Sequence, residues 1–113
     1  MMDSQTIDPA DLRSLIADVD PAILQLLPSY VANRHADLEV LDRSIAENDM
    51  TRLRRLGHNL KGSGAAYGLP PVSELGAGIE DAAKREAIGD LKQLRGELEQ
   101  LVMNLDAVLV DAQ

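Results

Sequence analysis

Apolar residues in this chain recur every three or four positions, which is the spacing of a helix with one buried face. Stripes of this kind run through residues 23–45, 53–67 and 72–83. A fourth stripe consists of Leu91, Leu94, Leu98, Leu101, Leu105, Val108 and Leu109. The pattern therefore predicts four long helices.

Two aspartate–proline pairs mark the beginnings of helices near the N-terminus. Asp8 and Asp20 are each suited to cap a helix, and the proline after each is suited to the first helical position. The first pair predicts a short leader helix, and the second predicts the start of a long helix that ends near Asn48. Pro28 should kink or restart this long helix, because proline lacks a backbone N–H and clashes with the preceding turn.

Capping residues and turn residues also mark the later helices. Asp49 can cap the next helix, and Gly68 stands where a residue in the left-handed conformation commonly ends one. Residues 69–71 are expected to form the turn that follows. The glycine and aspartate at 89–90 should separate the fourth stripe from the third. Connections this short make neighbouring helices antiparallel.

We therefore predict an all-α fold, an antiparallel up-and-down four-helix bundle over residues 20–112, with a short N-terminal capping helix in the leader, residues 1–19. A chain of 113 residues has room for one domain, so residues 1–113 are expected to form a single one. The sequence contains no Trp, no Phe and two Tyr. A core of Leu, Ile, Val and Ala suits packed helices better than sheets.

Composition and charge argue against several classes of function. The absence of Cys excludes disulfides and thiolate metal sites. No stretch is long and apolar enough for a membrane span and the N-terminus has no apolar signal core, so we expect a cytoplasmic protein without a membrane partner. A net charge of -8 argues against general nucleic-acid binding, which needs an excess of Lys and Arg.

One segment departs from this acidic character, because no acidic residue lies between Asp49 and Glu74. The cationic residues in this window are Arg52, Arg54, Arg55 and Lys61. They are expected to form a local positive patch on an otherwise acidic body. Chance clustering on a solvated helix face explains the charges alone equally well.

His58 lies nearly opposite the apolar stripe of residues 53–67 on a helical wheel, so it should face solvent. Its neighbours one and two turns away are Arg54, Arg55, Lys61, Gly62 and Ala65. At neutral pH a large fraction of an ordinary imidazole is the free base, which is a nucleophile toward phosphorus. The flanking cations would stabilise negative charge on transferred phosphoryl oxygens.

Two glycines in the same helix need an explanation, because each costs about 1 kcal/mol relative to alanine. Gly62, together with Ala65, would leave flat ground on which another protein could approach the imidazole. Gly64 faces the core side and would allow close helix packing. Close packing alone is the alternative explanation for both glycines.

The segment HNLKGSG at residues 58–64, followed by Tyr67 and Gly68, resembles the H-x-L-K-G-S signature of histidine-containing phosphotransfer (HPt) domains of bacterial two-component phosphorelays. The resemblance extends over nearly the whole chain. Gly57 departs from the alanine that this family often has before the histidine.

The resemblance implies a phosphocarrier protein rather than an enzyme that works without a partner. His58 would accept a phosphoryl group, usually on Nε2, from the aspartyl phosphate of a receiver domain and pass it to another receiver. Lys61 would stabilise charge beside it, and Gly62 would let the receiver's acidic pocket dock. The chain would need no cofactor of its own, since Mg²⁺ would belong to the receiver. A hybrid histidine kinase is a further expected partner.

Charge and geometry alone assign two further roles. Arg54 and Arg55 are expected to steer the acidic pocket of a receiver toward His58. Ala65 is expected to form part of the partner-binding surface.

Other functions stay open at this point. The chain could be a helical module that docks receivers without taking phosphate, or an independent enzyme such as a hydrolase, although a small bundle offers little room for a deep site. His35 is expected to be a half-buried or surface residue, and no other residues at suitable spacing support a metal site. The oligomeric state, the direction of phosphoryl flow and the alternatives of a free-standing protein or a fragment of a larger kinase are also open.

Overall fold

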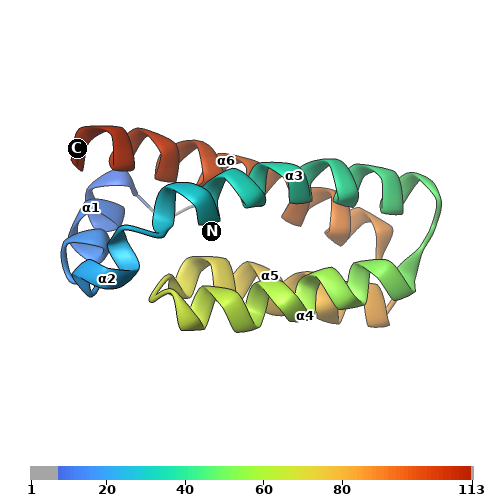
Figure 1. Cartoon of the computed structure of the whole chain (residues 1–113). Helices are drawn as coiled ribbons and strands as arrows, with labels where there is room; N and C mark the ends of the chain where they lie inside the picture. The colour runs from blue at the N-terminus through green and yellow to red at the C-terminus, as the bar shows by residue number, and fades with distance from the viewer. Residues whose placement is uncertain (1–7, 113) are drawn as a thin grey trace.

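The computed structural model describes residues 8–112, which form six helices and no strand. The helices are α1 (Pro9–Ala17), α2 (Pro21–Leu24), α3 (Leu27–Ala46), α4 (Met50–Ala66), α5 (Pro70–Lys84) and α6 (Ile88–Ala112). Figure 1 shows α3 to α6 as long rods that run in alternating directions, with α1 and α2 at the end of the bundle where α6 finishes. The predicted all-α fold, an up-and-down bundle of four long helices with a short helix at one end, is confirmed.

The predicted capping residues lie at helix ends. Asp8 and Asp20 each accept a hydrogen bond from the backbone N–H two residues further on, at 2.8 Å. At the start of α4, the Asp49 side chain accepts one from the backbone N–H of Arg52 at 3.0 Å. Gly68 has a φ of 71° just after α4, in the left-handed region that glycine adopts without steric cost. These contacts explain where α1, α2 and α4 begin and where α4 ends.

Prolines occupy the first turns of helices, where backbone N–H groups have no intrahelical partner in any case. Pro28 lies in the first turn of α3, so the expected long second helix is restarted there and the single turn α2 precedes it. Pro70 and Pro71 begin α5, so our prediction that they form the turn was wrong. For the same reason the turn between α4 and α5 is shorter than predicted. The α6 helix likewise begins at Ile88. It therefore includes the glycine and aspartate at 89–90, which were expected to precede it.

The core is built from aliphatic side chains of every long helix. In α4, Leu53 and Leu60 are fully buried, whereas Leu56 of this helix and Tyr67 just after it are half-buried at the edge of the core. The largest fully buried side chains elsewhere include Leu12, Leu27, Leu41, Leu69, Ile79, Leu91, Leu98 and Leu105. The apolar stripe predicted for α4 therefore faces the core, and the opposite side of the helix faces outward.

Three glycines bring the backbones of α4 and α5 into direct contact, and this helix pair has the most extensive contact in the described chain. A Cβ atom on Gly57 would lie 2.5 Å from the backbone nitrogen of Glu80. A Cβ atom on Gly64 would overlap the backbone of α5, and one on Gly76 would overlap the backbone of α4. Close packing therefore explains Gly64, as its position predicted, and it also explains Gly57.

Replacing Gly76 by alanine should lower the free energy of unfolding by about 2 kcal/mol, because the methyl group must push α5 away from α4. This loss exceeds the gain of about 1 kcal/mol that alanine has over glycine inside a helix. Urea unfolding followed by circular dichroism measures the difference.

Gly96→Ala in α6 is the matched control, since a Cβ atom there would meet nothing within 4 Å. This control should be at least as stable as the wild type. Equal stability of the Gly76→Ala and Gly96→Ala chains would contradict a tight α4–α5 interface.

Candidate functional site

His58 projects from the outer side of α4, and 67% of its side chain is exposed to solvent. The residues on the inner side of the same turns, Gly57 and Leu60, are buried. The helical wheel therefore predicted the orientation of His58 correctly.

The predicted neighbours of His58 lie on the same exposed surface. Arg54 and Arg55 are exposed one turn before it, and Gly62 and Ala65 are exposed one and two turns after it. A Cβ atom on Gly62 would meet nothing within 4 Å. Packing within the chain therefore does not require Gly62, unlike Gly64, and the space beside Gly62 is open.

Glu80 of α5 reaches the histidine ring across the α4–α5 interface. Its Oε2 atom lies 3.3 Å from His58 Nδ1, and its Oε1 atom lies 3.3 Å from Lys61 Nζ. Lys84 Nζ lies 3.9 Å from Glu80 Oε2. The Glu80 side chain is 17% exposed, whereas both lysine side chains are about half exposed. The charged group beside the ring is thus a carboxylate held between two ammonium groups.

Our prediction that His58 is flanked by cations was therefore incomplete, because it considered one helix alone and missed Glu80. Arg52, which was counted in the positive patch, instead pairs with Glu47 at 3.4 Å and with Asp49 at 3.5 Å. The described cations around the ring are Arg54, Arg55, Lys61 and Lys84. They outnumber the carboxylate of Glu80, so the described surroundings of His58 keep a net positive charge.

The charge state of Glu80 follows from its contacts. The Lys61 ammonium group holds the pKa of the Glu80 carboxyl below its usual value of 4.5. Partial desolvation acts in the opposite direction, and the charges of Lys84 and His58 again lower this pKa. Glu80 is therefore ionised at neutral pH. An ionised carboxylate beside Nδ1 favours the tautomer with the proton on Nδ1, which leaves the lone pair on Nε2.

The register of the α4–α5 pair is the signal that would have located Glu80 from the sequence. The backbones meet where Gly57 faces residue 80, Lys61 faces residue 76 and Gly64 faces residue 73. In each pair the two residues are equally far along the chain from the turn at residues 68 and 69. A tight antiparallel hairpin centred on that turn therefore places Glu80 beside Gly57 and His58.

Two residues of the signature segment, Ser63 and Tyr67, anchor α4 to Tyr30 of α3. The hydroxyl oxygens of Tyr30 and Ser63 form a hydrogen bond of 2.7 Å. The rings of Tyr30 and Tyr67 are stacked, with centroids 4.2 Å apart, and the Arg34 guanidinium lies 4.3 Å from the centroid of the Tyr30 ring. These contacts fix the rotation of α4 about its axis and so keep His58 on its outer side.

Comparison with protein families assigns the chain. A family model described as Hpt domain matches residues 25–109, which include nearly all of α3 to α6. The chain belongs to the Hpt-domain family. No curated protein and no solved structure matches the chain significantly. This Hpt domain is a phosphocarrier module with a phosphorelay role in two-component signalling, and the family works with response-regulator receiver domains and kinases.

The second histidine of the Hpt domain lies elsewhere. His35 is an exposed residue of α3, and its Nε2 atom lies 2.5 Å from Asp106 Oδ2 of α6. Between residues 8 and 112, no three or more His, Cys, Asp or Glu side chains are grouped to hold a metal ion. No helix in the described part of the chain is both long and apolar enough to cross a membrane.

The Glu80 carboxyl should titrate below pH 4.5 when it is followed by NMR of its carboxyl carbon. Lys61→Met should raise this pKa toward the usual value, because the contact with Lys61 is the largest cause of its lowering. Lys84→Met is the matched control and should raise the pKa less. A pKa that does not respond to Lys61→Met would show that the two side chains do not interact in solution.

The same contact makes stability depend on pH. Because the pKa of Glu80 is lower in the folded chain, its stabilising contribution is complete above about pH 4.5 and is lost as the pH falls through the folded pKa. Between about pH 6 and about pH 3, the wild type should therefore lose more unfolding free energy than Glu80→Gln. Equal losses of unfolding free energy in the wild type and in Glu80→Gln would contradict a stabilising contact between Glu80 and Lys61.

Proposed function

We propose that His58 accepts a phosphoryl group from the aspartyl phosphate of a receiver domain and transfers it to another receiver. The observation that carries this proposal is the exposed imidazole of His58, whose Nδ1 atom lies 3.3 Å from the Glu80 carboxylate. This arrangement leaves Nε2 as an accessible nucleophile. The family signature at residues 58–63 supports the same residue.

The proton stays on the ring during the proposed transfer. Nε2 attacks phosphorus, the bond between phosphorus and the aspartyl oxygen breaks, and the aspartate leaves as a free carboxylate. His58 then carries the phosphoryl group on Nε2 and a proton on Nδ1, so its ring is positively charged. Glu80 compensates this charge from 3.3 Å away. Transfer to the second receiver is the reverse of these steps with a different aspartate.

Lys61 is the proposed stabiliser of the phosphoryl oxygens. Its ammonium group pairs with Glu80, and its side chain is 47% exposed on the same surface as His58. The long, flexible lysine side chain can exchange this contact for the phosphoryl oxygens as negative charge arrives. Mg²⁺ belongs to the acidic pocket of the receiver in this proposal.

Docking uses the exposed outer surface of α4. Gly62 and Ala65 leave room for the rim of the receiver pocket to approach the ring, and Arg54 and Arg55 attract its acidic residues. Long-range attraction of this kind raises the rate of encounter more than the lifetime of the complex, and it weakens with salt.

His58→Gln should abolish transfer of radiolabelled phosphate from a panel of purified, phosphorylated receiver domains. The label on the wild type should be acid-labile and base-stable, as expected for phosphohistidine. His35→Gln is the matched control and should keep full transfer, because His35 pairs with Asp106 away from this surface. Labelling of a helical His58→Gln chain would overturn the proposal, and complex formation without label would favour a docking module instead.

Gly62→Gln should slow transfer at limiting concentrations by at least about tenfold, because the added side chain occupies the open approach to the ring. Folding should be unaffected, since a Cβ atom on Gly62 meets nothing within 4 Å. Gly96→Gln makes the same change on α6, where the space is equally open, and should transfer at the wild-type rate. Equal rates for the two variants would argue against docking at Gly62.

A further inference from the structure

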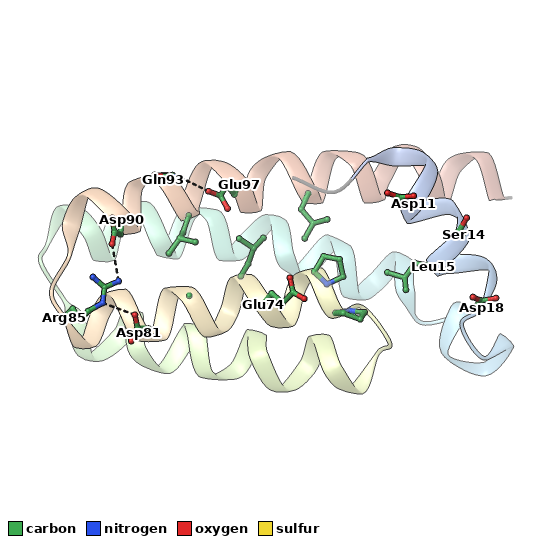
Figure 2. A pocket seen from close by; sticks show the side chains of 16 residues that line it. Asp11, Ser14, Leu15, Asp18, Glu74, Asp81, Arg85, Asp90, Gln93 and Glu97 are labelled. Atoms are coloured by element: carbon green, nitrogen blue, oxygen red, sulfur yellow. Dashed lines mark hydrogen bonds and ion pairs between the residues drawn. The ribbon is translucent and has the colours of Figure 1, made fainter. Parts of the chain in front are cut away.

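A groove of about 930 Å³ runs between α5 and α6 and is closed at one end by α1. Figure 2 shows Glu74, Asp81 and Arg85 on its α5 side and Asp90, Gln93 and Glu97 on its α6 side. It is an open trough rather than an enclosed cavity. The lining residues from Pro70 to Arg85 lie on successive helical turns, so the groove extends for about four turns, or about 22 Å.

The groove faces away from the histidine site. On a helical wheel Glu74, Gly78 and Asp81 of α5 and Arg85 at its C-terminal end form one stripe, and Glu80 lies about 130° from the centre of this stripe. A partner in the groove and a receiver at His58 would therefore contact different sides of α5.

The floor of the groove is apolar. Leu75 and Leu101 are almost fully buried beneath it, whereas Leu15 and Leu94 are half-buried and reach its surface. Gly78 leaves space above Leu94, because a Cβ atom on Gly78 would lie 3.2 Å from a methyl group of that leucine. A row of apolar side chains from a partner would find matching surface here.

The rim of the groove is strongly acidic. Its carboxylates belong to Asp11, Asp18, Glu74, Asp81, Asp90 and Glu97, and its cation is Arg85. Arg85 is already neutralised, since its guanidinium lies 2.9 Å from Asp81 and 3.1 Å from Asp90. The charge that a partner meets is therefore negative along both sides of the apolar floor.

One carboxylate oxygen on this rim has no hydrogen-bond donor among the described residues. Glu97 Oε2 accepts a hydrogen bond from Gln93 at 3.1 Å. Glu97 Oε1 is buried and accepts no hydrogen bond from any residue that the structure describes. A buried acceptor without a donor is costly, and rotation of the Glu97 carboxylate toward an ammonium or guanidinium group of a partner would remove this cost.

We propose that this groove binds a cationic amphipathic helix of a partner protein. The apolar stripe of that helix would pack on Leu15, Leu94 and the surface above Leu75, and its Lys or Arg side chains would reach the carboxylates on both rims. A helix of about four turns matches the length of the groove. This surface is separate from the proposed phosphotransfer site, so the domain can hold such a partner while a receiver docks at His58.

The test uses a fluorescent synthetic helix of about 18 residues with leucines on one face and lysines on the other. It should bind the full chain saturably, and NMR should show amide shifts in α1, α5 and α6 around the groove. A peptide with serines in place of the leucines and one with glutamates in place of the lysines should both bind at least about tenfold more weakly. Equal binding of the serine peptide would mean unspecific charge attraction and would overturn the proposal.

Variants of the chain provide the second arm. Glu74→Lys on the exposed rim should weaken binding of the leucine–lysine helix about fivefold, because it replaces an attraction with a repulsion. Glu39→Lys makes the same charge change on an exposed site of α3 outside the groove and should leave binding within about twofold. Both chains should keep wild-type phosphotransfer.

Equal weakening by the two substitutions would overturn the proposal, as would amide shifts centred on α4. Analytical ultracentrifugation tests whether the chain dimerises through this groove instead. A dimer of the chain that protects the same amides would make a second copy the occupant and would also overturn the proposal.

Discussion

Direct contact between the backbones of α4 and α5 determines where the proposed chemistry of this domain lies. Gly57, Gly64 and Gly76 remove the side chains that would otherwise hold the two helices apart. The contact fixes the register of the pair, and this register brings Glu80 to within 3.3 Å of His58 Nδ1. If α4 and α5 lay further apart by the width of a methyl group, the contact between Glu80 and His58 would loosen. This contact orients the proposed nucleophile.

The two sides of α5 serve different surfaces as a consequence. Glu80 and Lys84 lie toward α4 and belong to the charged cluster around the histidine. Glu74, Gly78 and Asp81 lie toward α6 and line the acidic groove. The contact of α5 with α6 is less extensive than its contact with α4, and the groove opens between α5 and α6.

Features that depend on a single helix or turn could be predicted from the sequence. The caps at Asp8, Asp20 and Asp49 and the outward orientation of His58 need no knowledge of neighbouring helices. Glu80 and the groove arise from the spacing and register of helix pairs, which single-helix periodicity does not contain. Pro70 and its neighbour were misplaced because proline suits a tight turn and a first helical turn equally well.

The central claim is that His58 keeps its proton on Nδ1 beside Glu80 and carries the phosphoryl group on Nε2. NMR of the chain labelled with ¹⁵N-histidine, recorded before and after phosphorylation by an active receiver domain, measures both nitrogens directly. The account predicts a protonated Nδ1 in both states and a bond from phosphorus to Nε2 of His58 in the second. Phosphorylation of Nδ1, or an unprotonated Nδ1 in the free chain at neutral pH, would contradict it.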